Sequence, residues 1–140
     1  MAHGKVIFFI PEDAGSPDGL DSMIESISLF AATGVARSLG SLREQLLPQA
    51  GQSRPIVIVL TPTRVDLERL LEVQDLFENT RLVLVLSDTG EETVALGHRM
   101  RPRFIGYLAN GFTEIAAVVQ KMAAGGPRPG RSIRERRLWA

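Results

Sequence analysis

Four short runs of apolar residues are spaced along the chain, and none of them alternates strictly with polar residues. They lie at residues 6–10, 56–60, 82–86 and 104–108 and consist mainly of Val, Ile, Leu and Phe. Uninterrupted runs of this length are typical of strands that are buried on both faces of a parallel sheet. The stretches between them are long enough for the crossover helices that parallel neighbours require. The pattern therefore predicts a parallel sheet whose strands alternate with helices.

Periodic apolar positions in the second half of the chain predict three helices. In residues 66–79 the apolar side chains recur every three or four positions with charges opposite, as in an amphipathic helix. Thr89 and Glu92 have the spacing of a capping box, which predicts the start of a helix that reaches Met100. Thr113 is expected to open the last helix. Its apolar stripe consists of Ile115, Val118, Val119 and Met122.

Residues 11–55 separate the first two apolar runs and are too many for a single crossover in a compact domain. A further strand and a further helix are therefore expected there. The preferred arrangement is a helix, a short edge strand and a second helix, over residues 18–32, 34–38 and 41–47. Ser41 and Glu44 have the capping-box spacing that would open the second of these helices.

One long helix over residues 21–47 is the alternative. Gly34 and Gly40 disfavour it, because glycine in a helix interior costs about 1 kcal/mol relative to alanine. The preferred arrangement gives five strands alternating with five helices. We therefore predict an α/β fold, a doubly wound five-stranded parallel sheet in the flavodoxin-like order 2-1-3-4-5 with helices on both faces.

The composition is that of one compact domain. The chain has 140 residues, of which 44% are hydrophobic, enough for a full core. It contains no cysteine, which rules out disulfides, thiolate metal sites and a thiol nucleophile and fits a reducing compartment. The first apolar run is far shorter than the ~20 residues of a membrane span, and acidic residues follow it at once. A soluble, cytoplasmic protein with no membrane partner is therefore expected.

The formal net charge is zero, but the charges are unevenly distributed along the chain. Residues 1–126 hold 11 Lys and Arg against 15 Asp and Glu, whereas residues 127–140 hold five Arg against one Glu. Two Pro and one Gly interrupt the start of this basic segment. We therefore divide the chain into a domain over residues 1–124 and a flexible basic tail over residues 125–140.

The segment from Arg81 to Phe112 has the order of elements found in one known family. An apolar run ends at Ser87-Asp88, a helical segment follows, and a second apolar run ends at Tyr107 with Leu-Ala-Asn-Gly-Phe after it. This order resembles the back half of a bacterial response-regulator receiver (CheY-like) domain, whose last strand typically reads aromatic-Leu-x-Lys-Pro-Phe. The resemblance extends over roughly residues 4–124, but the Lys and the Pro are absent here.

The resemblance implies roles for several positions. Family members hold a magnesium ion with acidic residues after the first strand, where this chain has Glu12 and Asp13. Ser87 matches the residue that senses the phosphoryl group, and Tyr107 matches the aromatic residue that couples to this sensor. These two residues are therefore candidates for a switch.

Two other positions imply that phosphorylation is lost. The family's acceptor aspartate closes the third strand, but this strand is expected to end at Leu60 and Thr61, and the next carboxylate is Asp66. The family's lysine position falls on Asn110 or Ala109. A carboxylate nucleophile and a cation that neutralises the phosphoryl group are both needed for the family's reaction. The resemblance therefore implies a degenerate pseudo-receiver.

Each retained position also has a simpler explanation. Glu12 and Asp13 lie in a loop rich in Gly, Ser, Pro and Asp, and a hard cation usually needs more than two oxygen ligands. We therefore expect no metal site, with these two residues as the only candidates for one. Ser87 is equally suited to cap a turn or a helix, and Tyr107 to pack as a core aromatic residue with its hydroxyl at the surface.

Arginines gather in two parts of the chain. Three of them bracket Pro102 before the last strand, namely Arg99, Arg101 and Arg103. The tail supplies further candidates, including Arg134, Arg136, Arg137 and Trp139. One interpretation is a solvated loop and a flexible tail; the other is a contact with an anion or a partner protein. The pI of 6.7 and the lack of a recognisable DNA- or RNA-binding motif argue against nucleic acid.

The sequence contains no phosphate-binding loop, dinucleotide-binding glycine motif, nucleophile elbow or cysteine nucleophile, so we expect neither an enzyme nor a bound cofactor. Two functions are left. The first is a non-phosphorylatable, receiver-like signalling module of the two-component type that acts by protein–protein interaction. Such a module could form a homodimer through its last two helices and last strand. The nearby residues that could contribute to this contact are Val94, Leu96, Met100, Tyr107, Val118 and Met122. The alternative is a flavodoxin-like protein or enzyme that binds a flavin or nucleotide with the loops after Ile10, Leu60 and Leu86.

Overall fold

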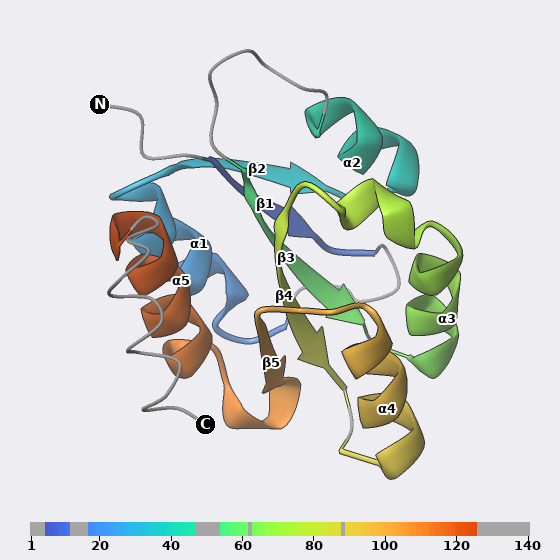
Figure 1. The fold of residues 1–140 in the computed structure, drawn as a ribbon. Coiled ribbons are helices and arrows are strands. Elements are labelled where there is room, and N and C mark those ends of the chain that lie inside the picture. Colours follow the sequence, from blue (N-terminus) through green and yellow to red (C-terminus); the bar gives the residue numbers. More distant parts are fainter. Residues whose placement is uncertain (1–4, 12–16, 47–53, 62, 88, 126–140) are drawn as a thin grey trace.

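The computed structural model describes residues 5–11, 17–46, 54–61, 63–87 and 89–125. These residues form one five-stranded sheet, shown in Figure 1. The strands are β1 (Lys5–Phe9), β2 (Ala32–Ala36), β3 (Ile56–Thr61), β4 (Arg81–Leu86) and β5 (Phe104–Tyr107). All neighbours are parallel, and the order is β2-β1-β3-β4-β5. The predicted doubly wound, flavodoxin-like α/β fold is confirmed.

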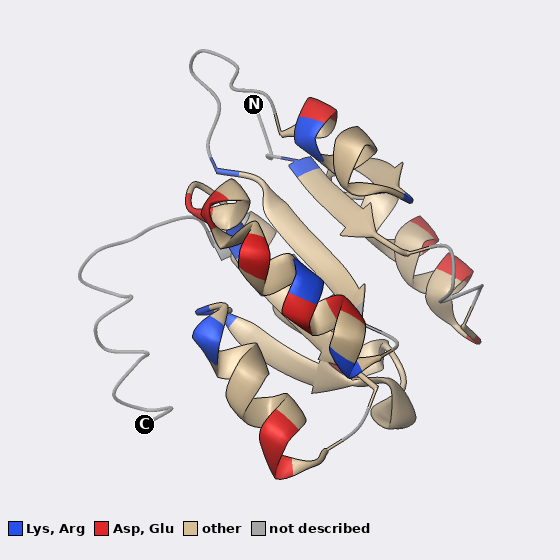
Figure 2. Ribbon diagram, turned by 90° about the vertical axis from the view of Figure 1, so that its right-hand side faces the viewer, with Lys and Arg blue, Asp and Glu red and all other residues tan. Residues whose placement is uncertain are grey.

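Helices cover both faces of the sheet. They are α1 (Leu20–Ser28), α2 (Leu39–Gln45), α3 (Arg64–Glu72), α4 (Glu91–Arg99) and α5 (Thr113–Gly125), with short 3-10 helices η2 (Gln74–Phe77) and η3 (Leu108–Asn110). The first and last of the α-helices pack on one face, and α2, α3 and α4 pack on the other, as Figure 1 and the turned view in Figure 2 show. None of the described helices combines the length and the apolar character needed to cross a membrane.

The three central strands, β1, β3 and β4, contribute buried side chains to both faces of the sheet. On the side of α1 and α5 the core includes Val6, Phe8, Ile58 and Val85, and on the other side it includes Ile7, Phe9, Val57 and Leu84. These side chains are at most 6% exposed. Because consecutive residues of a strand are buried on opposite faces of the sheet, each apolar run contains no polar residue.

The structure shifts the elements predicted between the first two apolar runs. The first helix is shorter than residues 18–32, and the edge strand lies at residues 32–36, two residues earlier than predicted, where Lys5 to Phe9 pair with it in register. Helix α2 also begins two residues early, at Leu39. The position of β2 excludes a single long helix in this part of the chain.

The predicted capping box at Ser41 and Glu44 is wrong by one turn. Ser38 is the N-cap of α2, and its side-chain oxygen accepts the backbone N–H of Ser41 at 3.1 Å. Both serines suit a helix start, but Ser38 follows directly on the end of β2 and has the extended backbone that a cap requires. The chain therefore enters α2 with almost no intervening loop.

Two of the three helices predicted in the second half also begin elsewhere. Helix α3 starts at Arg64 rather than at residue 66, because Thr63 caps it, and it ends at Glu72 before η2 carries the apolar face on to the buried Phe77. Helix α4 has Gly90 as N-cap and no side-chain capping bond, so the predicted capping box at residues 89 and 92 is wrong. Helix α5 begins at Thr113, as predicted.

Candidate functional site

The carboxyl edge of the sheet brings together most positions that the receiver resemblance singled out. In the parallel register Thr61 is aligned with Leu86, and Leu86 is aligned with Tyr107. Ser87 directly follows Leu86. The ends of β3, β4 and β5 therefore place the expected acceptor, sensor and aromatic positions side by side on neighbouring strands.

The side chains at this edge differ in their exposure. Leu60 is 0% exposed and belongs to the core on the side of α1 and α5. Ser87 is half-buried, and Tyr107 is half-buried and packs against the core on the opposite side. Asn110 is exposed at the end of η3, just before Gly111, whose φ of 76° is easily adopted only by glycine. Near the end of β3, a position that the resemblance assigns to the acceptor carboxylate is thus occupied by an apolar core residue, Leu60.

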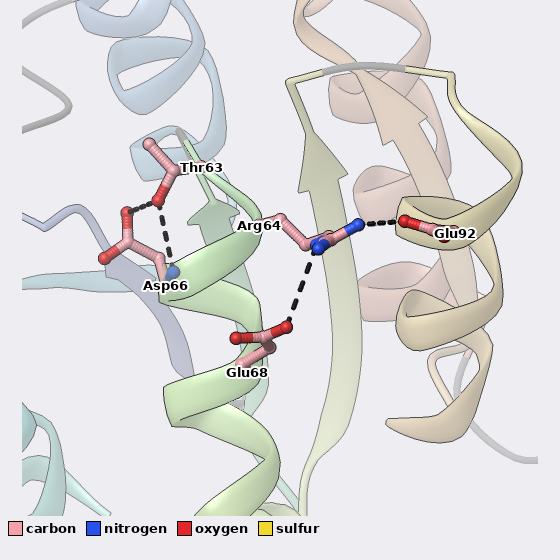
Figure 3. A network of polar contacts seen from close by, with 5 residues as sticks. All are labelled: Thr63, Arg64, Asp66, Glu68 and Glu92. Atoms are coloured by element: carbon pink, nitrogen blue, oxygen red, sulfur yellow. Dashed lines mark hydrogen bonds and ion pairs between the residues drawn. The ribbon is translucent and has the colours of Figure 1, made fainter.

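The nearest described carboxylate beyond β3 is used to start α3, as Figure 3 shows. Thr63 Oγ1 accepts the backbone N–H of Asp66 at 3.2 Å and donates its own hydrogen to Asp66 Oδ2 at 3.1 Å. The carboxylate therefore lies at the N-terminus of the helix, where the helix dipole stabilises negative charge. Sequence reasoning missed this cap, although Thr-x-x-Asp approximates the capping-box spacing.

Arg64 connects the starts of two helices beside this cap. Its guanidinium is 3.7 Å from the Glu68 carboxylate and also bonds Glu92 of α4 (Figure 3). The side chains involved are about half exposed or more, so their ion pairs add little stability. The network therefore links the starts of α3 and α4 at the surface of the protein without holding them firmly.

An open depression lies beyond the ends of β1 and β2, beside α3. It has a volume of about 450 Å³ and is lined by Phe9, Pro11, Arg37, Ser38, Leu39, Asp66, Arg69 and Leu70. Phe9 and Leu70 give it a buried apolar floor. Arg37 and Arg69 are exposed at its rim and form no ion pair with any described residue. Among the described residues, the loop after β1 is the one expected ligand-binding loop that lines the depression. The two rim arginines were missed because they lie 32 positions apart in the sequence.

The metal hypothesis concerns residues that the structure does not describe, since Glu12 and Asp13 lie outside the described ranges. Within those ranges, no group of three or more His, Cys, Asp or Glu residues is placed to hold a metal ion.

The opposite, amino-terminal edge of the sheet carries the arginines of the α4–β5 connection. Arg99, Arg101 and Arg103 are all exposed. Arg101 has a φ of 58°, in the left-handed region that side chains rarely adopt. The tail candidates Arg134, Arg136, Arg137 and Trp139 lie outside the described residues.

Two further arginines lie at this edge. The Arg81 guanidinium donates from Nη2 and Nε to the carbonyl oxygen of Arg54, at 2.8 and 3.2 Å, and from Nη1 to that of Met122 at 3.0 Å. Burial lowers the pKa of Arg81, and the nearby charges of Arg103 and Arg54 lower it further. The three cations are thus close together.

Sequence reasoning missed Arg54 and Arg81, although a signal was present. Arg54 lies two residues before β3, Arg81 begins β4 and Arg103 directly precedes β5. Because parallel strands begin at the same edge of a sheet, cations at three consecutive strand starts must gather there.

Comparison with known proteins gives no match to a family model, a curated protein or a solved structure. The fold class is that of flavodoxin-like α/β proteins, and kinship with receivers stays a prediction from the sequence.

Proposed function

We propose that the protein is a non-phosphorylatable, receiver-like regulatory module that acts by binding another protein. One observation carries the proposal: Leu60, the penultimate residue of β3, is fully buried where the resemblance puts the phosphoacceptor of a receiver. Transfer of a phosphoryl group to a side chain needs an accessible nucleophile, and an aliphatic core residue supplies none.

Two other features support the loss of phosphorylation. The carboxylate of Asp66 accepts a hydrogen bond from Thr63, the N-cap of α3, so it belongs to the start of this helix. Asn110 stands where a receiver has its lysine and carries no positive charge to neutralise a phosphoryl group. Ser87 and Tyr107, on neighbouring strand ends, are then left to relay a change at this edge to the surface of α4 and β5.

The protein–protein contact that we propose for the homodimeric form uses α4, β5 and α5. Its half-buried apolar side chains are Val94, Leu96, Tyr107, Val118 and Met122. Met100 is only 3% exposed and adds little to such a surface. A two-component signalling pathway is the setting in which a receiver-like module of this kind would act.

Phosphorylation is tested with acetyl phosphate and Mg²⁺, followed by intact-mass spectrometry. We expect no phosphoryl adduct under conditions in which an active receiver domain, run in parallel, becomes phosphorylated. An acid-stable but base-labile adduct on any Asp would overturn the proposal. Light scattering after size exclusion tests the homodimer, and a monomer across the accessible concentration range would contradict that form alone.

A second candidate function is the binding of a small ligand such as a flavin or a nucleotide. The depression between α2 and α3 favours it, because its volume of about 450 Å³ falls within the roughly 300–1,000 Å³ of ligand pockets. The depression also lies beyond the carboxyl ends of parallel strands, where α/β proteins bind their ligands. Its apolar floor and the two rim arginines suit an anionic molecule with a flat apolar part.

This candidate is tested by thermal shift with FMN and with adenosine monophosphate. A rise in melting temperature that is lost in Arg37→Gln and Arg69→Gln would support it. Arg43→Gln is the matched control, since Arg43 is an exposed arginine of α2 that does not line the depression. An equal shift in all three variants would place the binding elsewhere.

A further inference from the structure

The arginines at the amino-terminal edge of the sheet form one surface, which we call the arginine edge. It consists of Arg54, Arg81, Arg99, Arg101 and Arg103. We propose that the arginine edge docks an acidic segment of a partner protein, whose carboxylates bind between these guanidiniums. The inference rests on the proposed function as an interaction module and specifies the chemistry of the partner.

The arginine edge is a concentration of like charge that the described part of the chain leaves uncompensated. Burial lowers the pKa of Arg81, and the positive charges of Arg103 and Arg54 lower it further. Within the described residues, no carboxylate forms an ion pair with any member of the arginine edge. An incoming carboxylate would therefore relieve repulsion as well as form hydrogen bonds.

The backbone that carries the exposed arginines is held at several points. Gln74 Nε2 of η2 donates to the carbonyl oxygen of Arg99, and the Arg101 N–H donates to His98 O at 3.0 Å. The Arg103 N–H donates to Leu82 O at 2.7 Å. A connection fixed in this way loses little conformational freedom on binding, so more of the contact energy appears as affinity.

Arg101 occupies a backbone conformation that disfavours an arginine. Its φ of 58° follows the last turn of α4, the place where helices commonly end on a left-handed glycine. Glycine would adopt this conformation without strain, whereas a residue with a Cβ does not. Strain that persists under an exposed charged side chain points to a role for that side chain in binding.

Hydrogen bonds to two backbone carbonyl groups hold the Arg81 guanidinium in place and use only part of its N–H donors. Its guanidinium carries five N–H groups, and the bonds to Arg54 O and Met122 O engage three nitrogen atoms with one hydrogen each. Within the described residues, one hydrogen on each terminal nitrogen has no partner. Because α5 and the start of β3 fix the plane of this group, it is positioned for a carboxylate before any partner arrives.

The surroundings favour a short acidic peptide over nucleic acid. Gln74 contacts Arg99, and the next residues of the same segment include the exposed carboxylates Asp75 and Glu78. Residues 1–126 as a whole carry more acidic than basic residues. A long polyanion would meet these negative charges beside the arginine edge, whereas a segment with a few carboxylates need only contact the arginines.

The test measures fluorescence anisotropy of a labelled peptide of Glu and Ser residues, titrated with the full-length protein. The same peptide with Gln in place of Glu is the chemical control. We expect binding of the Glu peptide alone, with an affinity that falls as NaCl is raised. Arg103→Gln should weaken it on the order of tenfold, because a charged hydrogen bond is lost. Arg43→Gln, a charge change on α2, should leave it unchanged.

Arg101→Gly separates binding from folding. Relief of the left-handed strain should raise the melting temperature, while loss of the guanidinium should weaken peptide binding. A variant that binds the Glu peptide as tightly as the wild type would overturn the role of Arg101, and unchanged binding in both arginine variants would overturn the proposal.

Tighter binding of a labelled oligothymidine than of the Glu peptide, lost in the same variants, would overturn the choice of partner class. A protein that fails to bind the peptide but still takes up no phosphate and forms a dimer would contradict the arginine edge alone. The failure of this inference is therefore distinct from the failure of the proposed function.

Discussion

Arg81 Nη1 donates a hydrogen bond to the carbonyl oxygen of Met122 at 3.0 Å, joining the first residue of β4 to the last turns of α5. The last four carbonyls of a helix have no partner within the helix, and a cation beside them also interacts favourably with the helix dipole. The same guanidinium bonds the carbonyl oxygen of Arg54 just before β3. One side chain thus connects two strand starts and the final helix.

Replacing Arg81 should loosen this attachment of α5. Arg81→Met keeps an apolar stem but removes all three hydrogen bonds, and we expect the free energy of unfolding to fall by about 1–3 kcal/mol. Arg81→Lys keeps the charge near α5 but lacks the planar fork that reaches both carbonyls, so its loss should be intermediate. Urea denaturation followed by circular dichroism measures both, with Arg43→Gln as the surface control. A wild-type value for Arg81→Met would show that apolar packing alone holds α5.

The exposed edge of β2 is partly covered by Gln45, and Gly34 makes room for it. Gln45 Nε2 donates to Val35 O at 3.0 Å, and a Cβ added at Gly34 would clash with Gln45 Oε1. We expect Gly34→Ala and Gln45→Ala each to lower the free energy of unfolding by about 1 kcal/mol. When Gln45 is already alanine, Gly34→Ala should leave the free energy of unfolding almost unchanged, because the Gln45 side chain is no longer there to clash with the added Cβ. Additive effects in this double-mutant cycle would contradict the coupling.

Two buried glycines should respond in opposite ways to the same substitution. A Cβ at Gly106 would lie 2.9 Å from both Cγ1 and Cδ1 of Ile115, so Gly106→Ala forces β5 and α5 apart and should cost about 1–3 kcal/mol. At Gly97 the nearest atom would be 3.4 Å away on Leu86, an ordinary contact, and alanine is the better helix former by about 1 kcal/mol. Gly97→Ala should therefore be neutral or stabilising. Thermal unfolding of the two variants distinguishes these outcomes.

Most of the fold could be predicted because buried parallel strands leave an unmistakable run of apolar residues. The exception was β2, whose sequence Ala-Thr-Gly-Val-Ala is short and weakly apolar, since an edge strand is only partly covered. Helix starts were also misplaced. Ser38 and Ser41 are both suitable caps three residues apart, and only the pairing of β2 with β1 decides between them.

The candidate sites were harder to predict than the strands. Arg99, Arg101 and Arg103 are close in sequence and were recognised as a group, whereas Arg54 and Arg81 join them only through the parallel sheet. The depression likewise combines residues after β1 and β2 with residues of α3. Spacing along the chain does not reveal such groups until the strand order is known.

The polar network at the start of α3 yields a last prediction. Its helix cap at Thr63 should contribute more to stability than its ion pairs at Arg64. Thr63 accepts the backbone N–H of Asp66 at 3.2 Å and satisfies a donor that has no partner within the helix, so Thr63→Ala should lower the free energy of unfolding by about 1 kcal/mol. Arg64 forms two ion pairs but is exposed, as are its partners Glu68 and Glu92. Arg64→Ala should therefore change the free energy of unfolding by less than about 1 kcal/mol. Because salt screens exposed ion pairs, the difference between this variant and the wild type should become smaller at high NaCl. Urea titrations of both variants at low and high NaCl measure these effects. A larger loss for Arg64→Ala than for Thr63→Ala would mean that the bridge between α3 and α4, rather than the cap, fixes this corner of the fold.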